Sequence, residues 1–518
     1  MRSTSLLSLH DDVLLVIFSL LGRNDALATS STSRLFANVY WDRDIEVDKG
    51  DASEARALSR YMRAPEPYSK VPRVQHLRNF TLHHFCDVDV PPLRKLLSQA
   101  TNLRTIDIHN FEHFVHQDRL LVEAIGAMHK LEQASLINIG PETVASLSKM
   151  LSSRYLTSLT LKLDDASFSL RPGDMDIEKL ISGLASMQSL HTLSLFSYFV
   201  QTDPLRLPNA FQTILPSIRH LSFCCYLQTP LGIITLCPNV TTLYLRLIAG
   251  PGERPVTLRI AEEDRWPTGL KRLDVPSPAV IPAARRVGRV DSLALGEISP
   301  ISDTDDLSEF LQLLVAVRPT AVKLHTTPTI ADPDRVWGTL CGVAPGLRSL
   351  DIVVTCGECD VREYVDDPVD SWRATEARRV EALRPLPPQI VEALPTLRVL
   401  ALSSCLPGRQ ASTPDERAPA RGPRRGGDGS ARARKRCGAA VGTDSEFVSP
   451  ALRRLRELRT EIPRDERWWW VEGDGAARTP VEIWREDGEK ARELIKDASL
   501  DPARSLDGFY SARCRYEW

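Results

Sequence analysis

One apolar pattern recurs along most of the chain and constrains its fold more than any other feature. The pattern reads apolar-x-x-apolar-x-apolar, with its first copy at 77–82, its last at 397–402 and a degenerate copy at 322–324. Most copies follow one another about every 27 residues, a spacing typical of structural repeats. Many stretches between the copies carry a helical apolar periodicity: 92–99, 119–128, 142–151, 177–186 and 307–317.

A short strand and a one-faced helix cannot each bury their apolar side alone. Stacked copies bury these sides against one another and place the strands next to each other in a parallel sheet. The sequence therefore predicts an α/β repeat array, with strands along one face and helices along the other. An unrelated α/β domain with alternating strands and helices is the competing interpretation.

The period and the apolar triplets resemble those of leucine-rich repeats. The family carries Asn or Cys shortly after the third apolar residue, and here Cys405 is the matching residue. The resemblance implies a solenoid with parallel strands on its concave face, and the missing Asn implies irregular coils whose loops are hydrogen-bonded in another way. The other residues at this position are apolar or aromatic: Phe85, Phe111, Ile139, Tyr198, Tyr226 and Ile248.

The N-terminal stretch 9–36 predicts a small helical packet that needs a partner. Its first helix is apolar on both sides, so two bodies must cover it, and about 40 residues are too few for a stable domain. A signal peptide is disfavoured by Asp11 and Asp12, and the apolar run is less than half of the ~20 residues that a membrane span needs. An ordinary buried core helix remains the alternative.

The order and spacing of residues in this stretch resemble an F-box. His10 stands where the family has proline, and Ala26, Thr29 and Ser31 stand where it prefers apolar residues. The matching positions are Leu9, Asp11, Asp12, Val13, Leu14, Leu15, Ile17, Phe18, Leu21, Asp25, Leu27, Thr32, Ser33 and Arg34.

The F-box resemblance implies a substrate-recognition subunit of an SCF-type (Skp–cullin–F-box) ubiquitin ligase. Such a receptor binds a Skp-type adaptor, and through it a cullin, and it holds a target protein without catalysing the reaction. The alternative is a non-catalytic leucine-rich-repeat scaffold with no ligase role. By the family pattern the adaptor contact falls to Leu9, Val13, Leu14, Ile17, Phe18, Leu21 and Leu27.

In a leucine-rich array, the strand residues between the inward apolar ones lie on the concave face. Aromatic residues and arginine are the usual binding hot spots, although the same row is also compatible with a merely solvated strand face. The predicted target-binding residues are His109, Lys162, Phe196, Tyr244, Arg246, Lys323 and His325, within a row that also holds Asp107, Thr160, Ser194, Asp274 and Asp351.

The composition changes along the chain and predicts its division into segments. Residues 406–447 are rich in Arg, Gly, Pro and Ala and are expected to be disordered, and their basic run 432–436 is compatible with a nuclear import signal or a solvated linker. Trp468–Trp470 favours a packed cap over an interface. The predicted segments are an F-box (1–40), an adapter (41–75), a repeat solenoid (76–405), the insertion (406–447) and a Trp-containing cap (448–518).

The remaining chemistry is sparse. A formal net charge of −2 makes no electrostatic case for nucleic-acid or membrane binding, and ten scattered cysteines favour the cytoplasm or nucleus. P-loop, H-E-x-x-H and G-x-S-x-G motifs are absent, so we expect no enzyme and no cofactor. Cys356 and Cys359 lack a second ligand pair. The histidines between 83 and 116 would need convergent carboxylates to hold a metal, so no metal is expected there.

Overall fold

A computed structural model describes residues 44–47, 52–65, 72–83, 90–163, 177–197, 214–226, 232–248, 267–275, 288–295, 304–326, 333–355, 385–405, 466–473 and 475–495. The F-box-like segment, the 356–359 cysteine pair and the 406–447 insertion lie outside the described residues. The described elements fall into two compact units, with the strands up to Ile248 in unit 1 and those from Arg272 onward in unit 2.

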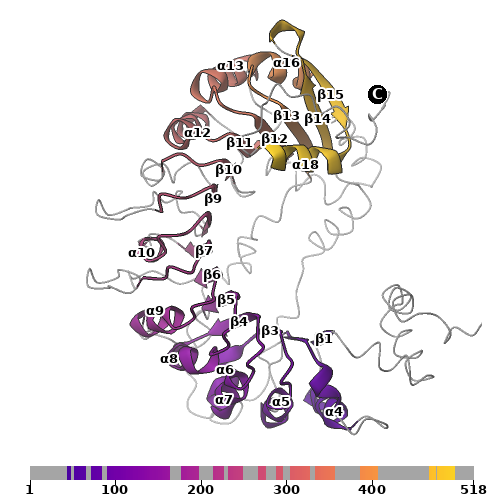
Figure 1. Cartoon of the computed structure of the whole chain (residues 1–518), viewed down its shortest axis with the longest axis vertical. Helices are drawn as coiled ribbons and strands as arrows, with labels where there is room; N and C mark the ends of the chain where they lie inside the picture. Colours follow the sequence, from indigo (N-terminus) through magenta and orange to yellow (C-terminus); the bar gives the residue numbers. More distant parts are fainter. Residues whose placement is uncertain are drawn as a thin grey trace, which may run out of the picture. The chain divides into compact units, whose positions relative to one another are not determined.

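Unit 1 is a parallel sheet whose strands follow chain order, with helices along one side of it (Figure 1). The strands are β1 (Asp44–Val47), β2 (Asn79–Leu82), β3 (Thr105–Ile108), β4 (Gln133–Ile139), β5 (Ser158–Leu163), β6 (Thr192–Ser197), β7 (His220–Tyr226) and β8 (Thr242–Ile248). The helices are α4 (Ala52–Arg63), α5 (Val90–Leu97), α6 (Phe111–Gln117), α7 (Leu120–Gly126), α8 (Pro141–Met150), α9 (Ile177–Ala185) and α10 (Gly232–Thr235), with a 3-10 turn at Arg73–His76.

The apolar triplets form the core of this array, as the sequence pattern predicts. Leu103, Ile106 and Ile108 are each 0% exposed, and every triplet residue along the chain is at most 5% exposed. The first residue of a triplet precedes its strand, and the other two alternate with half-buried residues, as on β3. Full burial of each such side chain contributes about 1.5–3 kcal/mol, so the repeated triplet stabilises the stack far more than any single loop.

The loops after β3 and β4 show how the array manages without the family's asparagine. Phe111 and Ile139 fill that position as fully buried apolar residues. One residue earlier, Asn110 and Asn138 adopt positive φ angles of 54° and 59°, and Asn138 Nδ2 donates to Asn110 Oδ1 at 2.8 Å. The loop hydrogen bonds are therefore met from a neighbouring position, since asparagine tolerates the left-handed conformation.

Unit 2 repeats the same design with five further parallel strands. The parallel strands are β9 (Arg272–Val275), β10 (Ser292–Leu295), β11 (Ala321–Thr326), β12 (Ser349–Thr355) and β13 (Val399–Cys405). The associated helices are α12 (Thr304–Val317), α13 (Pro333–Val343) and α16 (Leu386–Ala393). The degenerate copy at Val322 and Leu324 has a third buried residue in the structure, because Pro319 occupies the position of the first apolar residue.

The described part of the tail adds two antiparallel strands and a helix to the unit 2 strands. β14 (Glu466–Glu472) pairs antiparallel with β13, and β15 (Thr479–Ile483) pairs antiparallel with β14; a 3-10 turn at Gly475–Ala477 joins the two. α18 (Arg485–Ile495) then packs on the face opposite α12, α13 and α16 (Figure 1). The cluster between this helix and the sheet comprises Val399, Ala401, Trp468, Trp470, Ile483, Ala491 and Ile495.

Each unit is thus an irregular α/β repeat array, with mostly parallel strands and helices alongside, and it resembles the leucine-rich-repeat arrangement that the period predicts. The predicted helices at 92–99, 119–128, 142–151, 177–186 and 307–317 correspond to α5, α7, α8, α9 and α12, with ends shifted by a few residues. No helix among the described residues is both long and apolar enough to cross a membrane.

Candidate functional site

The candidate site is the polar strand face of unit 1, which we define by two rows of half-buried side chains. Row 1 is fixed by the strand register and comprises Thr81, Asp107, Ser135, Thr160, Ser194, Ser222 and Tyr244. Row 2 lies two residues further along the strands and comprises His83, His109, Ile137, Lys162 and Phe196.

Alternation along each strand creates this face. In β3 the side chains of Ile106 and Ile108 point into the core, so those of Asp107 and His109 must point to the opposite face. Row 1 is dominated by small hydroxyl side chains, and Tyr244 lies at its far end. Row 2 carries the histidines, Lys162 and Phe196. The face therefore offers many hydrogen-bonding groups and a few large side chains, of which Phe196 and Tyr244 are of the types enriched at protein interfaces.

The structure brings four of the predicted target-binding residues together on this face. His109, Lys162, Phe196 and Tyr244 all belong to the two rows, and all are half-buried. The backbone of Arg246 aligns with Cys224 on β7, but its side chain lies outside the described residues. Row 2 also contains His83, which was not among the predicted target-binding residues.

The equivalent face of unit 2 is covered in part by the tail. Lys323 on β11 is half-buried, whereas His325 is 2% exposed and Asp351 is 8% exposed. Arg492 of α18 lies over this face, with its Nη1 3.4 Å from Asp351 Oδ2 and its guanidinium 5.1 Å from the Trp468 ring centroid. Little of His325 or Asp351 is accessible there, so unit 1 presents the larger candidate surface.

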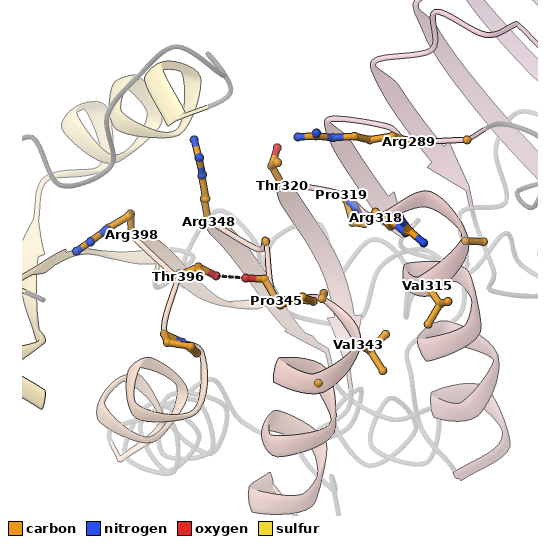
Figure 2. A pocket seen from close by; sticks show the side chains of 16 residues that line it. Arg289, Val315, Arg318, Pro319, Thr320, Val343, Pro345, Arg348, Thr396 and Arg398 are labelled. Atoms are coloured by element: carbon orange, nitrogen blue, oxygen red, sulfur yellow. Dashed lines mark hydrogen bonds between the residues drawn. The ribbon is translucent and has the colours of Figure 1, made fainter. Parts of the chain in front are cut away.

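A hollow of about 980 Å³ lies in unit 2, beside the loops that precede β10 to β13. Arg289, Arg318, Arg348 and Arg398 line it, and none of its lining residues is acidic. Figure 2 shows the side chains of Arg318, Arg348 and Arg398 pointing in different directions. Arg398 Nη1 already donates to the carbonyl oxygen of Gly473 at 2.8 Å. The hollow is basic, but its arginines do not converge on one point as a preformed anion site would require.

A buried carboxylate joins two successive repeats next to the polar strand face. Glu112, 3% exposed, accepts hydrogen bonds from the backbone N–H groups of Gly140 and Glu142 at 2.8 Å and of Thr143 at 3.1 Å, and from the Thr143 hydroxyl. These donors form the N-terminus of α8, where an anion is favoured by the helix dipole. These hydrogen bonds all tie Glu112 to the next repeat, so Glu112 is a structural group.

The pKa values of two other groups in unit 1 are shifted by their surroundings. The hydrogen bond from exposed Arg119 lowers the pKa of Glu142, an effect weakened by solvent. Burial raises the pKa of the Cys237 thiol to about 12, so that thiol is protonated at neutral pH.

Comparisons with known proteins give only distant similarities. No protein-family model matches the sequence, and no curated protein matches it. One similar solved structure is the leucine-rich repeat-containing protein LegL7 from Legionella pneumophila, 13% identical, covering 63% of this chain and 90% of that chain with a TM-score of 0.36. Another is that of the Rad7 and Elc1 complex in yeast, 13% identical, covering 69% of this chain and 94% of that chain with a TM-score of 0.30.

Proposed function

We propose that this chain is the substrate-recognition subunit of an SCF-type ubiquitin ligase, acting in the cytoplasm or nucleus. The observation that carries the proposal is the ordered match of residues 9–34 to the F-box pattern. Its association with a leucine-rich-repeat array supports the proposal, because such an array presents an extended surface for binding proteins.

The adaptor contact follows from the apolar helix, two-sided by its sequence pattern, that the sequence predicts near the N-terminus. In this proposal one side of the helix packs within the F-box and the other meets a Skp-type adaptor, which links the chain to a cullin. An apolar helix of this kind is costly to leave in water, so the adaptor stabilises the F-box as it binds. The proposed contact residues are Leu9, Val13, Leu14, Ile17, Phe18, Leu21 and Leu27.

The target contact is proposed for the polar strand face of unit 1. Phe196 and Tyr244 supply large side chains that fit the role of hot spots, and Lys162 and the hydroxyl groups of row 1 supply polar complementarity. Bond chemistry belongs to the conjugating enzyme in this scheme. The chain's contribution is to raise the effective concentration of a target lysine near the activated ubiquitin.

Co-expression with a Skp-type adaptor tests the proposal. We expect a stable complex on size-exclusion chromatography, and loss of the complex in an Ile17→Asp/Leu21→Asp variant, because two charges would enter an apolar contact. The matched control is Leu120→Asp/Ile214→Asp, which makes the same kind of change at residues 46% and 56% exposed and should leave binding intact.

Absence of binding by the unaltered chain would overturn the ligase proposal. Residues 9–36 would then act as an apolar end of the array, and the chain would be a leucine-rich-repeat scaffold. Equal binding by the unaltered chain and the Ile17→Asp/Leu21→Asp variant would show instead that the adaptor contacts some other surface.

A further inference from the structure

Three metal-ligating side chains meet at the N-terminal end of the polar strand face. Asp107 and His109 are two residues apart on and just beyond β3, so their side chains point to the same face. His83 occupies the same position after β2, and β2 and β3 are parallel neighbours in register. Because adjacent strands lie about 4.8 Å apart, the repeat itself brings the two imidazoles together.

The donor atoms converge in a way that the sequence alone does not reveal. His83 Nδ1 lies 2.9 Å from His109 Nε2, and the two rings meet edge to face with centroids 4.4 Å apart. Asp107 Oδ1 lies 4.0 Å from the same His109 Nε2. One ligand atom from each of the three residues lies within 4.8 Å of the other two.

The carboxylate of Asp107 gives an independent indication that a ligand is expected there. Its Oδ1 is shielded from solvent and accepts no hydrogen bond from the described residues. A buried acceptor without a donor is unfavourable, and more so when it is charged. A cation placed between Asp107 and the two imidazoles would satisfy this oxygen, which the neighbouring side chains leave unsatisfied.

We propose that His83, Asp107 and His109 bind one divalent transition-metal ion, with Zn²⁺ as the best fit. Two imidazoles with one carboxylate favour zinc over calcium or magnesium, which prefer all-oxygen sites. Three protein ligands also leave a fourth position of a tetrahedral ion open for water or for a donor group of a docked partner. The earlier expectation of no metal assumed that no carboxylate converged on these histidines, and Asp107 supplies one.

The observed geometry lies close to a tetrahedral site. With zinc–ligand bonds of about 2.0–2.2 Å, donor atoms on one tetrahedral ion are about 3.3–3.5 Å apart. The histidine nitrogens are slightly closer than this, and the carboxylate oxygen is slightly further. Each of these two distances differs from the tetrahedral value by about 0.5 Å, which is within the reach of side-chain rotations.

Isothermal titration calorimetry, with ZnCl₂ added to the chelator-treated full chain, tests the site. We expect one tight site that is lost or weakened more than about 100-fold in His109→Ala and in Asp107→Asn, since even the loss of an outer contact weakens metal sites 10- to 100-fold. Asp107→Asn keeps the side-chain shape and relieves an unsatisfied charge, so it should fold. Substitution of Co²⁺ should give tetrahedral absorption bands in the unaltered chain, and these bands should disappear in both variants.

The control is His129→Ala, at an exposed histidine of the same unit that is not part of the cluster. It should bind Zn²⁺ as the unaltered chain does. The proposal is overturned if the unaltered chain shows no stoichiometric site, or if the Asp107→Asn and His109→Ala variants bind as tightly as the control. The site depends only on the repeat geometry, so its outcome is separate from that of the adaptor experiment.

Discussion

At the scale of single residues, Glu112 shows how hydrogen bonds between successive repeats can form without the loop asparagine of leucine-rich repeats. Its carboxylate reaches from α6 to the first turn of α8 and receives three backbone N–H groups that the helix cannot satisfy itself. The same two repeats are also joined by Asn110 and Asn138. Adjacent coils are therefore linked by polar side chains at positions that the apolar repeat pattern does not mark.

Glu112→Gln should loosen α8. The amide would place N–H donors against backbone N–H donors, and hydrogen bonds to a charged group contribute about 1.5–3 kcal/mol. For a loss of about 2 kcal/mol, we expect amide exchange in peptides covering 140–151 to be about 30-fold faster by hydrogen–deuterium exchange mass spectrometry.

Glu123→Gln is the matched control for this change. Glu123 is exposed on α7, so exchange in 140–151 should stay at the rate of the unaltered chain. Unchanged protection of α8 in Glu112→Gln would show that the carboxylate is dispensable for this helix.

At the scale of elements, the packing of α18 depends on a glycine. A Cβ atom at Gly488 would lie 2.8 Å from Trp468 Cγ, and other atoms of the same ring would be closer still. Trp468 is 1% exposed, so its ring has no room to move away. The helix can therefore approach β14 closely only because residue 488 has no side chain.

Gly488→Ala should destabilise the tail even though alanine is the better helix former. The propensity gain is about 1 kcal/mol, while overpacking a core costs about 1–3 kcal/mol, so the net effect should be a loss. Urea denaturation followed by tryptophan fluorescence measures it, as a lower midpoint for the transition that reports Trp468–Trp470.

Gly338→Ala, in the same unit, should have the opposite effect on stability to Gly488→Ala. Gly338 lies inside α13, and a Cβ atom there would meet nothing within 4 Å. The substitution should stabilise the chain by up to about 1 kcal/mol. If both alanine variants raised the urea midpoint, the inference that α18 packs closely against Trp468 would be wrong.

At the scale of the whole molecule, the end of the unit 2 sheet is closed by a change of strand direction. β13 pairs with β12 on one edge and with antiparallel β14 on the other, and α18 buries Val399 and Ala401. Without the tail, a strand of seven residues would be an open edge beside an exposed apolar patch.

Truncation after residue 447 should therefore cause aggregation of the chain. We expect a large loss of soluble monomer by size-exclusion chromatography with light scattering, measured with the adaptor co-expressed. Deletion of 411–440 alone is the control, because a long insertion contributes little to stability and its loss should leave the monomer intact. A truncated chain that remained monomeric would show that β14, β15 and α18 are not needed to protect the sheet.

The sequence by itself determined the α/β architecture, because the apolar triplets recur with a period that stacked strands and helices satisfy. Even the copy with Val322 and Leu324 was recognisable, although the role of Pro319 was not. The strand face could be predicted from alternation alone, and four of the predicted target residues lie on it. The short helix α6 had no comparable signal, because its buried Phe111 and Phe114 occupy a single turn.

Only the tertiary structure decided which polar residues meet. Contacts across repeats join residues about one period apart, such as His83 with His109 and Glu112 with Gly140, and the exact register sets their distance. The side chain of Arg492 in the tail covers Asp351, a contact that no local sequence pattern could show. Apolar periodicity is a local property that a sequence displays directly, whereas convergence of polar atoms depends on register and on long-range packing.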